Sequence, residues 1–401
     1  TRPNSLELSL KLDSYFRPDK QSRPTSRRYA KALSSTLKAF TTPILLKPKS
    51  FDDVFENYPH KGTSPGLPYT KSGYRKKGLV PKHYAQKFYQ KFQKDAFHSV
   101  PCNGWFRTCV AKQPKFRCIW VYPFHVTLAE ARFAQPLIQL YKGLKTPYSI
   151  WMNFTRGDMR SLIKQRQSGQ TWVSLDWSGF DTSVPSWLIR DAFDILRSQF
   201  TFEASEQDLW NKVVEYFINT PVKYPSGVVR VKSNSVPSGS YFTNLLDSVI
   251  NHIVCAFLMR FDKIYVMGDD ALLLVREVPS LTDIATIARF IFGMELNVDK
   301  SESGALVSYL GYKMSEEGYP MANYDKLVAQ LLLPDRPDRD VNDFARRAKA
   351  LMLSCFGIGC LRFSSLVQAY LREHSLEDID PAGYIMNKLA HIGLGDFGSV
   401  N

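Results

Sequence analysis

The sequence has few cysteines, and none of them has the spacing of a metal site or a redox motif. Its six cysteines include no CxxC pair and no histidine at a zinc-ligand spacing. We therefore expect small buried thiols in a reducing compartment and no zinc site. His125 and His252 are likewise expected to be hydrogen-bonded packing residues and not metal ligands.

Long apolar runs are also missing. The most apolar stretch, residues 245–259, is interrupted by Asp247, Asn251 and His252, so no membrane span is expected there. We predict a protein that makes no membrane contact. The chain begins with Thr1, and the residues that follow do not predict a secretory leader.

Negative charge is scarce in the first third of the chain. Residues 1–120 hold 24 Lys and Arg against 7 Asp and Glu, whereas the remaining residues hold 28 against 31. All the excess positive charge therefore lies in one part of the chain, which favours a polyanion as the partner of that part. A solvated basic surface kept for solubility would explain the charge alone equally well.

Apolar residues make up 44% of the chain, which predicts a large core. The Gly- and Pro-rich residues 60–82 are typical of a loop, and the first 50 residues predict an irregular outer layer with one helix near 29–39. Strands are predicted at 171–176, at 263–275 and as a short pair within 307–321. Helices are predicted at 185–200, 241–259 and 282–291, and in most of the chain after residue 340.

The tripeptide Gly268-Asp269-Asp270 joins the two predicted strands of residues 263–275. Two adjacent carboxylates beside apolar strands concentrate negative charge, which is unfavourable unless cations balance it. Oxygen ligands of this kind suit Mg²⁺ or Mn²⁺ better than zinc. Taken alone, the tripeptide is more often an ordinary exposed turn, because Asp and Gly are favoured in turns.

Asp176 ends another predicted strand, residues 171–176. A sheet that pairs this strand with the hairpin would bring Asp176 beside Asp269. Three converging carboxylates can hold two divalent ions about 4 Å apart, the arrangement that supports in-line attack of a hydroxyl on phosphorus.

Three motifs follow one another in a set order: LDWSGFD at 175–181, VPSGSYFTNLLDSVIN at 236–251 and VMGDDALL at 266–273. This order resembles motifs A, B and C of viral RNA-dependent RNA polymerases, and the wording is most similar to the partitiviruses, with picobirnaviruses next. Four further segments resemble the template-channel motif, the basic fingers motif and the fourth and fifth palm motifs of the family; they are TSPGLPY (63–69), RTCVAKQPKFRCIW (107–120), NVDKSE (297–302) and SYLGYKM (308–314).

The resemblance implies an α+β right-hand polymerase fold of fingers, palm and thumb, with an antiparallel palm sheet backed by helices. The division that it implies is fingers with an N-terminal arm at 1–170, palm at 171–200 and 236–320, a fingers insertion at 201–235, and a helical thumb at 321–401.

The resemblance also implies catalytic roles. Asp176 and Asp269 match the main metal ligands of the family, and Asp270 supports them. Lys300 matches a lysine that protonates the leaving pyrophosphate. A salt bridge of Lys300 to Asp299 or Glu302 is an open alternative.

Nucleotide contacts are implied for motifs A and B. Asp181 matches the group that senses the ribose 2′-hydroxyl, although it could also cap the helix at 185–200. Thr243 has the spacing to join Asp181 in this contact. Ser238 and Gly239 would lie in a loop in which glycine lets the backbone approach the nascent base pair.

Asp247 departs from the family pattern, because many related enzymes have Asn at this position. Two facing carboxylates require that one be protonated, pair with a donor, or point away. Asn244 or Asn251 could supply the amide instead.

The remaining implied contacts lie in the fingers. Four cations would neutralise the triphosphate, with Arg117 foremost, unless they form a solvated basic loop; they are Arg107, Lys112, Lys115 and Arg117. Template RNA would be contacted by Thr63, Ser64, Gly66, Tyr69 and Lys71. Of these, Tyr69 would stack on a base.

The resemblance finally implies cofactors, partners and location. It implies two Mg²⁺ ions, for which Mn²⁺ could substitute, together with template and product RNA, nucleoside triphosphates and a viral capsid protein. It implies replication and transcription of a double-stranded RNA genome in the virion interior, within the host cytoplasm.

Two other kinds of protein stay open. A reverse transcriptase shares the palm and the paired aspartates, but would carry an aromatic residue near the sugar, where this chain has Asp181. A non-catalytic RNA-binding or capsid-associated protein would explain the basic first third but would leave Asp176, Asp269 and Asp270 without a purpose.

Overall fold

The computed structural model describes residues 4–19, 21–95, 100–109, 115–334 and 337–383, except for the side chains of residues 107–109 and 115. The described elements are helices and mainly antiparallel strands, so the predicted α+β class is confirmed.

A four-stranded antiparallel sheet with the order β10-β3-β8-β7 carries the Gly-Asp-Asp turn. Its strands are β3 (Thr171–Leu175), β7 (Lys263–Met267), β8 (Asp270–Val275) and β10 (Glu302–Gly304). β7 and β8 confirm the predicted hairpin, and β3 pairs with β8 as expected. Two shorter strands, β4 (Trp177–Ser178) and β9 (Glu295–Leu296), pair with each other.

Helix α10 (Thr243–Leu258) packs on β7 and β8. Around α10 lie α2 (Arg27–Phe40), α8 (Ser186–Arg197) and α11 (Leu281–Phe292). α10 is buried on nearly every side because it lies between the sheet and these helices, so its apolar residues do not follow a single stripe. The short helix α7 (Phe180–Ser183) precedes α8.

A second sheet has the order β2-β1-β5-β6. Its strands are β1 (Cys102–Cys109), β2 (Lys115–Val121), β5 (Pro221–Lys223) and β6 (Val229–Val231). After α9 (Ala204–Ile218) the chain returns to this sheet, where β5 pairs with β1. The two strands run parallel.

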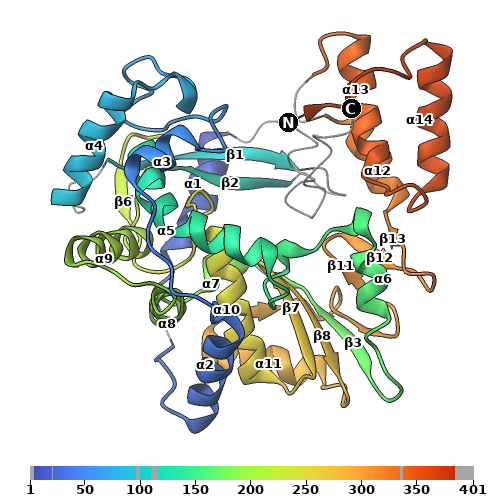
Figure 1. The fold of residues 1–401 in the computed structure, drawn as a ribbon, viewed down its shortest axis with the longest axis horizontal. Helices are drawn as coiled ribbons and strands as arrows, with labels where there is room; N and C mark the ends of the chain where they lie inside the picture. Colours follow the sequence, from blue (N-terminus) through green and yellow to red (C-terminus); the bar gives the residue numbers. More distant parts are fainter. Residues whose placement is uncertain (1–3, 20, 96–99, 110–114, 335–336, 384–401) are drawn as a thin grey trace.

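Helix α5 (Phe124–Gly143) runs between the two sheets (Figure 1) and is buried along most of its length. Helices α3 (Phe51–Glu56), α4 (Lys82–Lys94) and α9 pack against it. Residues 60–82 form turns with one 3₁₀ turn, η2 (Lys77–Leu79), as a loop was predicted there. The 3₁₀ turns η3 (Ser149–Trp151) and η4 (Phe154–Arg156) and helix α6 (Asp158–Ile163) follow α5.

The N-terminal segment is more regular than predicted. Besides α2 it contains α1 (Ser5–Asp13) and the 3₁₀ turn η1 (Ser14–Phe16). Asn4 and Glu7 form a capping box at the start of α1, and Leu8 and Leu12 are buried. The prediction of a single helix was wrong because α1 is short and is stabilised by packing on β1 and β2 as well as by its own pattern.

The C-terminal part has a hydrophobic cluster of its own. Strands β11 (Ser308–Tyr309), β12 (Tyr312–Met314) and β13 (Pro320–Met321) form a small sheet. Helices α12 (Tyr324–Leu332), α13 (Val341–Leu353) and α14 (Leu361–Glu373) follow and lie together at the upper right of Figure 1. The helical tail is thus confirmed over the described residues.

Burial is confirmed for the described cysteine side chains and for both histidines. Five cysteines are buried and free: Cys102, Cys118, Cys255, Cys355 and Cys360. His125 and His252 are buried, and each Nδ1 lies in a hydrogen bond, with the Tyr69 hydroxyl and the Thr36 hydroxyl respectively. None of the helices in the described ranges has the length and apolar content needed to cross a bilayer.

Candidate active site

The turn between β7 and β8 is held from α10. Gly268 has a φ of 64°, a left-handed conformation that glycine adopts without strain. The Asn251 Nδ2 donates to the carbonyl oxygens of Gly268 and Asp269 at 3.1 and 2.9 Å, and the Gly268 N–H donates to the Ser248 Oγ at 2.8 Å. These two α10 side chains therefore fix the backbone that presents the acidic pair.

Asp176 follows directly on β3. Because Leu175 pairs with Ala271, the antiparallel register places Asp176 opposite Asp270. The charge of Asp176 also acts on Asp269, which agrees with the expectation that the two lie close together. All three carboxylates nevertheless come to the same end of the central sheet.

The acidic turn carries unbalanced negative charge. Desolvation by the surrounding protein, followed by the charges of Asp269 and Asp176, raises the pKa of Asp270 to about 7. Desolvation also raises the pKa of Asp269, with a smaller contribution from Asp176. Both side chains remain solvent-exposed, so a cation can reach them. Neither forms an ion pair within the described part of the chain.

The carboxylates do not form a complete ligand set as they lie. Among the described residues, no three Asp, Glu, His or Cys side chains are grouped closely enough to hold one metal ion. Their oxygen atoms and their unbalanced charge still fit a hard divalent cation. Holding such an ion would require the side chains to move closer together.

A second acidic pair lies behind the turn. Burial, followed by the charges of Asp181 and Asp269, raises the pKa of Asp247 well above its ordinary value. The Asp247 Oδ1 is buried without a hydrogen-bond partner among the described residues. Burial and Asp269 also raise the pKa of Asp181 to about 7, which Arg117 opposes. Of the three alternatives for Asp247, protonation therefore agrees best with its surroundings.

Two alternatives left open by the sequence are wrong: the Asn251 amide in the sugar site and the capping role of Asp181. Asn251 cannot supply the amide of the sugar site, because its Nδ2 is used by the turn and its Oδ1 accepts from the Trp177 Nε1 at 3.2 Å. Asp181 does not cap the helix at 185–200, because α8 begins after Pro185 and Asp181 lies within α7. Asn244 is exposed, and its Oδ1 accepts from the Tyr148 hydroxyl at 2.8 Å.

The loop of residues 237–241 is packed against β2. The Ser238 Oγ donates to the Cys118 carbonyl oxygen at 3.1 Å and accepts from the Trp120 N–H at 3.3 Å. A Cβ on Gly239 would lie 1.7 Å from the Trp120 carbonyl oxygen. Gly239 is therefore required for contact with β2, which corrects the expectation that it approaches the nascent base pair.

The Thr243 hydroxyl is hydrogen-bonded within the loop before α10. Its Oγ1 lies 2.7 Å from the Pro237 carbonyl oxygen and 3.0 Å from that of Ser240. Its hydroxyl hydrogen is thus used within the loop, and only its lone pairs stay available to a sugar.

Of the predicted cations, Lys115 and Arg117 lie on β2 and Arg107 lies on β1. Arg117 is exposed, and its charge opposes the raised pKa of Asp181, Asp269 and Asp270, so it acts on the acidic site. Arg107 pairs with Arg117 in the backbone register. The side chains of Arg107 and Lys115 are not described, and Lys112 lies outside the described residues.

For two residues, Tyr69 and Gly66, the predicted contact with RNA is wrong. Tyr69 is fully buried, and its hydroxyl is hydrogen-bonded to the His125 Nδ1 at 3.1 Å, so it cannot stack on a base without leaving the core. Gly66 is also buried, and a Cβ there would lie 2.6 Å from the Tyr122 carbonyl oxygen. The exposed residues of the set are Thr63, Ser64 and Lys71.

Lys300 is exposed after the strand β9. The Glu302 carboxylate accepts from the N–H and hydroxyl of Ser308, both at 2.9 Å. Within the described part of the chain Lys300 forms no ion pair with Asp299 or Glu302, so the salt-bridge alternative is wrong.

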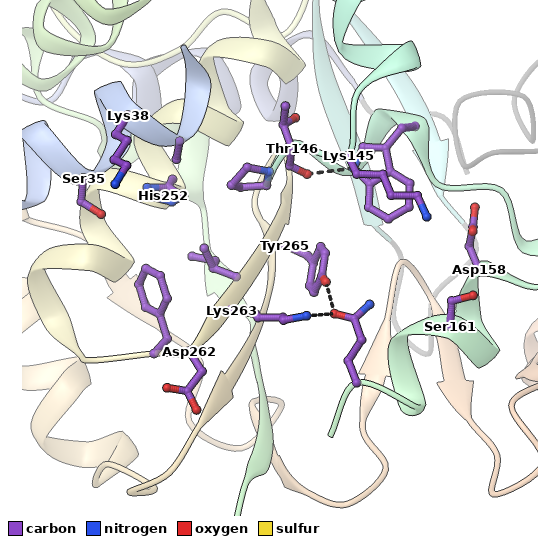
Figure 2. A pocket seen from close by; sticks show the side chains of 16 residues that line it. Ser35, Lys38, Lys145, Thr146, Asp158, Ser161, His252, Asp262, Lys263 and Tyr265 are labelled. Atoms are coloured by element: carbon purple, nitrogen blue, oxygen red, sulfur yellow. Dashed lines mark hydrogen bonds between the residues drawn. The ribbon is translucent and has the colours of Figure 1, made fainter. Parts of the chain in front are cut away.

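A cavity of about 620 Å³ lies elsewhere, along the outer edge of β7 between α2 and α6. Lys263 Nζ and the Tyr265 hydroxyl converge there on Gln165 Oε1, at 2.8 and 2.5 Å (Figure 2). None of the acidic residues of the turn lines this cavity, so it is separate from the candidate active site.

Sequence reasoning missed Ser248, the role of Asn251 in holding the turn, and Glu130, whose carboxylate accepts from Ser240 and Tyr241. The signal for the first two is their spacing of three residues on α10, which puts both on the face that meets the turn. No helix was predicted at α5, and Glu130 shows there only as a charge among apolar residues.

Comparisons with known proteins agree with the geometry. The model of the family described as viral RNA-dependent RNA polymerase matches residues 13–333. The RNA-directed RNA polymerase of Cryptosporidium parvum virus 1 (strain KSU-1) is 27% identical over 291 residues, covering 68% of this chain and 54% of the relative. That of White clover cryptic virus 1 (isolate Boccardo/2004) is 27% identical over 168 residues, covering 33% and 27%. The chain thus spans about half the length of the first relative and about a quarter of the second.

A solved structure shows the same fold. The crystal structure of the RNA-dependent RNA polymerase of a human picorbirnavirus matches 97% of this chain and 83% of that chain, with a TM-score of 0.69 at 17% identity. The likeness confirms the predicted α+β right-hand fold with its antiparallel palm sheet.

Proposed function

The chain belongs to the viral RNA-dependent RNA polymerase family, and we propose that it catalyses template-directed RNA synthesis from ribonucleoside triphosphates. The observation that carries the proposal is that Asp176 lies opposite Asp270, beside the turn that holds Asp269. The charges of these carboxylates act on one another. Such a set of carboxylates is what nucleotidyl transfer with two metal ions requires.

Asp176 and Asp269 are the metal ligands in this proposal, and Asp270 supports them. Their oxygen ligands suit Mg²⁺, with Mn²⁺ as a substitute. When bound, two such ions lower the pKa of a 3′-hydroxyl and neutralise the charge of a triphosphate. The chain contributes a turn whose backbone is fixed by Asn251 and Ser248, so that only the carboxylate side chains have to adjust when ions bind.

Asp181 and Thr243 contact the ribose 2′-hydroxyl. Asp247 is protonated and replaces the amide of related enzymes, since a protonated carboxyl keeps one O–H donor. The loop before α10 and the exposed Asn244 complete the nucleotide site, with Ser238 and Gly239 holding the loop against β2.

Arg117 neutralises the incoming triphosphate together with Arg107, Lys112 and Lys115. Lys300 protonates the leaving pyrophosphate by general acid catalysis. In the proposed division, residues 1–170 and 201–235 form the fingers, 171–200 and 236–320 the palm, and 321–401 the thumb. Thr63, Ser64 and Lys71 guide the template in the fingers.

The kinship with these viral polymerases supports replication and transcription of a double-stranded RNA genome. It supports work inside a virus particle in the host cytoplasm, with a capsid protein as a partner. Binding of a capsid protein to the purified chain would support the proposed partnership.

The test is an extension assay with Mg²⁺ or Mn²⁺ on a defined RNA template, offering either ribonucleotides or deoxyribonucleotides. Asp269→Asn should lose nearly all synthesis, whereas Glu277→Gln, an exposed carboxylate just beyond β8, should keep it. Equal synthesis by the wild type and Asp269→Asn would refute the two-metal site. A preference for deoxyribonucleotides would point to a reverse transcriptase.

A further inference from the structure

Glu130 is a fully buried carboxylate on α5, outside the acidic site. Its two oxygens accept hydrogen bonds from the Ser240 hydroxyl and the Tyr241 N–H, both at 2.7 Å. The Ser240 Oγ in turn accepts from the Phe242 N–H at 3.0 Å. Phe242 is the N-cap of α10 and provides no side-chain cap, so Glu130 and Ser240 supply the acceptors at this helix start.

The same loop is held by a second element. Ser238 is hydrogen-bonded to the backbone of Cys118 and Trp120 on β2, and Gly239 leaves no room for a side chain beside Trp120. Residues 237–241 are therefore fixed by β2 through their first half and by α5 through their second half.

Burying a carboxylate costs free energy of desolvation, which only its hydrogen bonds and nearby charges can offset. Burial raises the pKa of Glu130 to about 7, while Ser240, Tyr241 and the charge of Lys77 oppose this. Lys77 packs its ammonium 5.0 Å from the Tyr58 ring centre. An apolar residue would fill the volume but would leave the Tyr241 N–H without an acceptor.

We propose that Glu130 is a positioning residue for ribose selection, which acts by fixing the loop 237–241 and with it the first turns of α10. Asp247 lies on those turns and interacts with Asp181, and Thr243 is the first residue of the helix. Glu130 touches no substrate, so its effect reaches the nucleotide only through the loop. This inference rests on the proposed function, because it takes a ribonucleotide as the ligand.

Incorporation of one ribonucleotide and of its 2′-deoxy counterpart, measured with the full chain on an RNA template, tests this. Glu130→Ala should reduce the ratio of the two kcat/KM values roughly tenfold, about the effect of one lost hydrogen bond. The ribonucleotide KM should rise more than kcat falls. Ser240→Ala should show part of this change.

Glu130→Gln should restore most of the selectivity. Its amide oxygen can accept from Tyr241, and its NH₂ can donate to the Ser240 hydroxyl. The matched control is Glu215→Gln, a carboxylate on α9 that is paired with Arg190, which should keep the wild-type ratio. A folded Glu130→Ala with the wild-type ratio and KM would overturn the inference.

Hydrogen exchange separates this inference from the proposed function. Amides of residues 240–243 should exchange faster in Glu130→Ala, or in Ser240→Ala if the first variant does not fold, but not in Glu215→Gln. If the wild type makes no RNA, the proposed function fails and ribose selection fails with it, while faster exchange would still show that Glu130 fixes the loop. Unchanged exchange in both variants would refute the anchoring itself.

Discussion

The Asn251 Nδ2, on the buried helix α10, donates a hydrogen bond of 2.9 Å to the backbone carbonyl oxygen of Asp269. The acidic turn is thus oriented by a neutral side chain that need not touch the substrate. The Asn251 amide and the hairpin together fix the backbone that carries the carboxylates.

Replacing Asn251 with Leu should reduce kcat roughly tenfold or more, because two carbonyl oxygens lose their donor and the turn relaxes. The ribonucleotide KM should change less than kcat. Single-turnover extension measures both, with Asn219→Leu at the end of α9 as a control for losing an amide elsewhere. Unchanged single-turnover rates would show that the hairpin keeps its shape without Asn251.

Replacing Gly239 with Ala should reduce activity strongly, since the new Cβ would lie 1.7 Å from the Trp120 carbonyl oxygen and must displace the loop. Gly143→Ala is the matched control, because nothing lies within 4 Å of a Cβ there. Comparable activity in both variants would mean that the loop does not need its contact with β2.

Metal affinity should increase with pH. The pKa of Asp270 is raised to about 7, and a carboxylate must lose its proton before it binds a cation. The dissociation constant for Mn²⁺, measured without RNA by calorimetry, should therefore fall between about pH 6 and about pH 8. A constant value across this range would argue against protonated ligands in the free protein.

Stability should decrease in acid through the buried histidines. Burial lowers the pKa of His125 to about 3 and that of His252 to about 4, below the ordinary value of 6.5. Below pH 6.5 the unfolded chain therefore binds protons that the folded chain does not, and stability is lost as the pH falls toward these values. Each histidine contributes about 1.4 kcal/mol per pH unit.

His252→Gln should remove one proton from this dependence when the free energy of unfolding is measured by urea titration at several pH values. The exposed His83→Gln on α4 serves as its control. Equal pH dependence in the wild type and His252→Gln would contradict the expectation.

Lys232→Met should destabilise the fold by roughly 3 kcal/mol. The buried Lys232 Nζ lies within hydrogen-bond distance of four carbonyl oxygens, those of Phe217, Ile218, Asn234 and Ser235, which share its three N–H donors. Met would leave these oxygens without a donor. Denaturant midpoints compare it with Lys223→Met on β5. If both variants unfold at the same midpoint, these carbonyls have other partners.

The central elements could be predicted because their signals are local. The hairpin at 263–275 and the helix at 241–259 have apolar patterns that specify their type, and the strand at 171–176 ends in a carboxylate. The order of the three motifs then indicated that Asp176 and Asp269 act together as metal ligands.

The contacts that were missed depend on residues distant in the sequence. Tyr69 lies in a segment with the composition of a surface loop. Only its contact with His125 reveals it as a core residue. Gly239 looks like a substrate contact until β2 is seen to lie against it. Glu130 has no pattern at all, since its partners lie more than a hundred residues later.

The N-terminal segment has a consequence for biosynthesis. Arg28 on α2 donates to the carbonyl oxygens of Phe257 and Leu258, and Asp13 pairs with Arg230. These partners leave the ribosome more than two hundred residues later, at about 5–20 residues per second. The basic first part of the chain must therefore wait for roughly ten seconds or longer before it can dock, and until then it is free to bind the nearest polyanion, including the ribosomal RNA beside it.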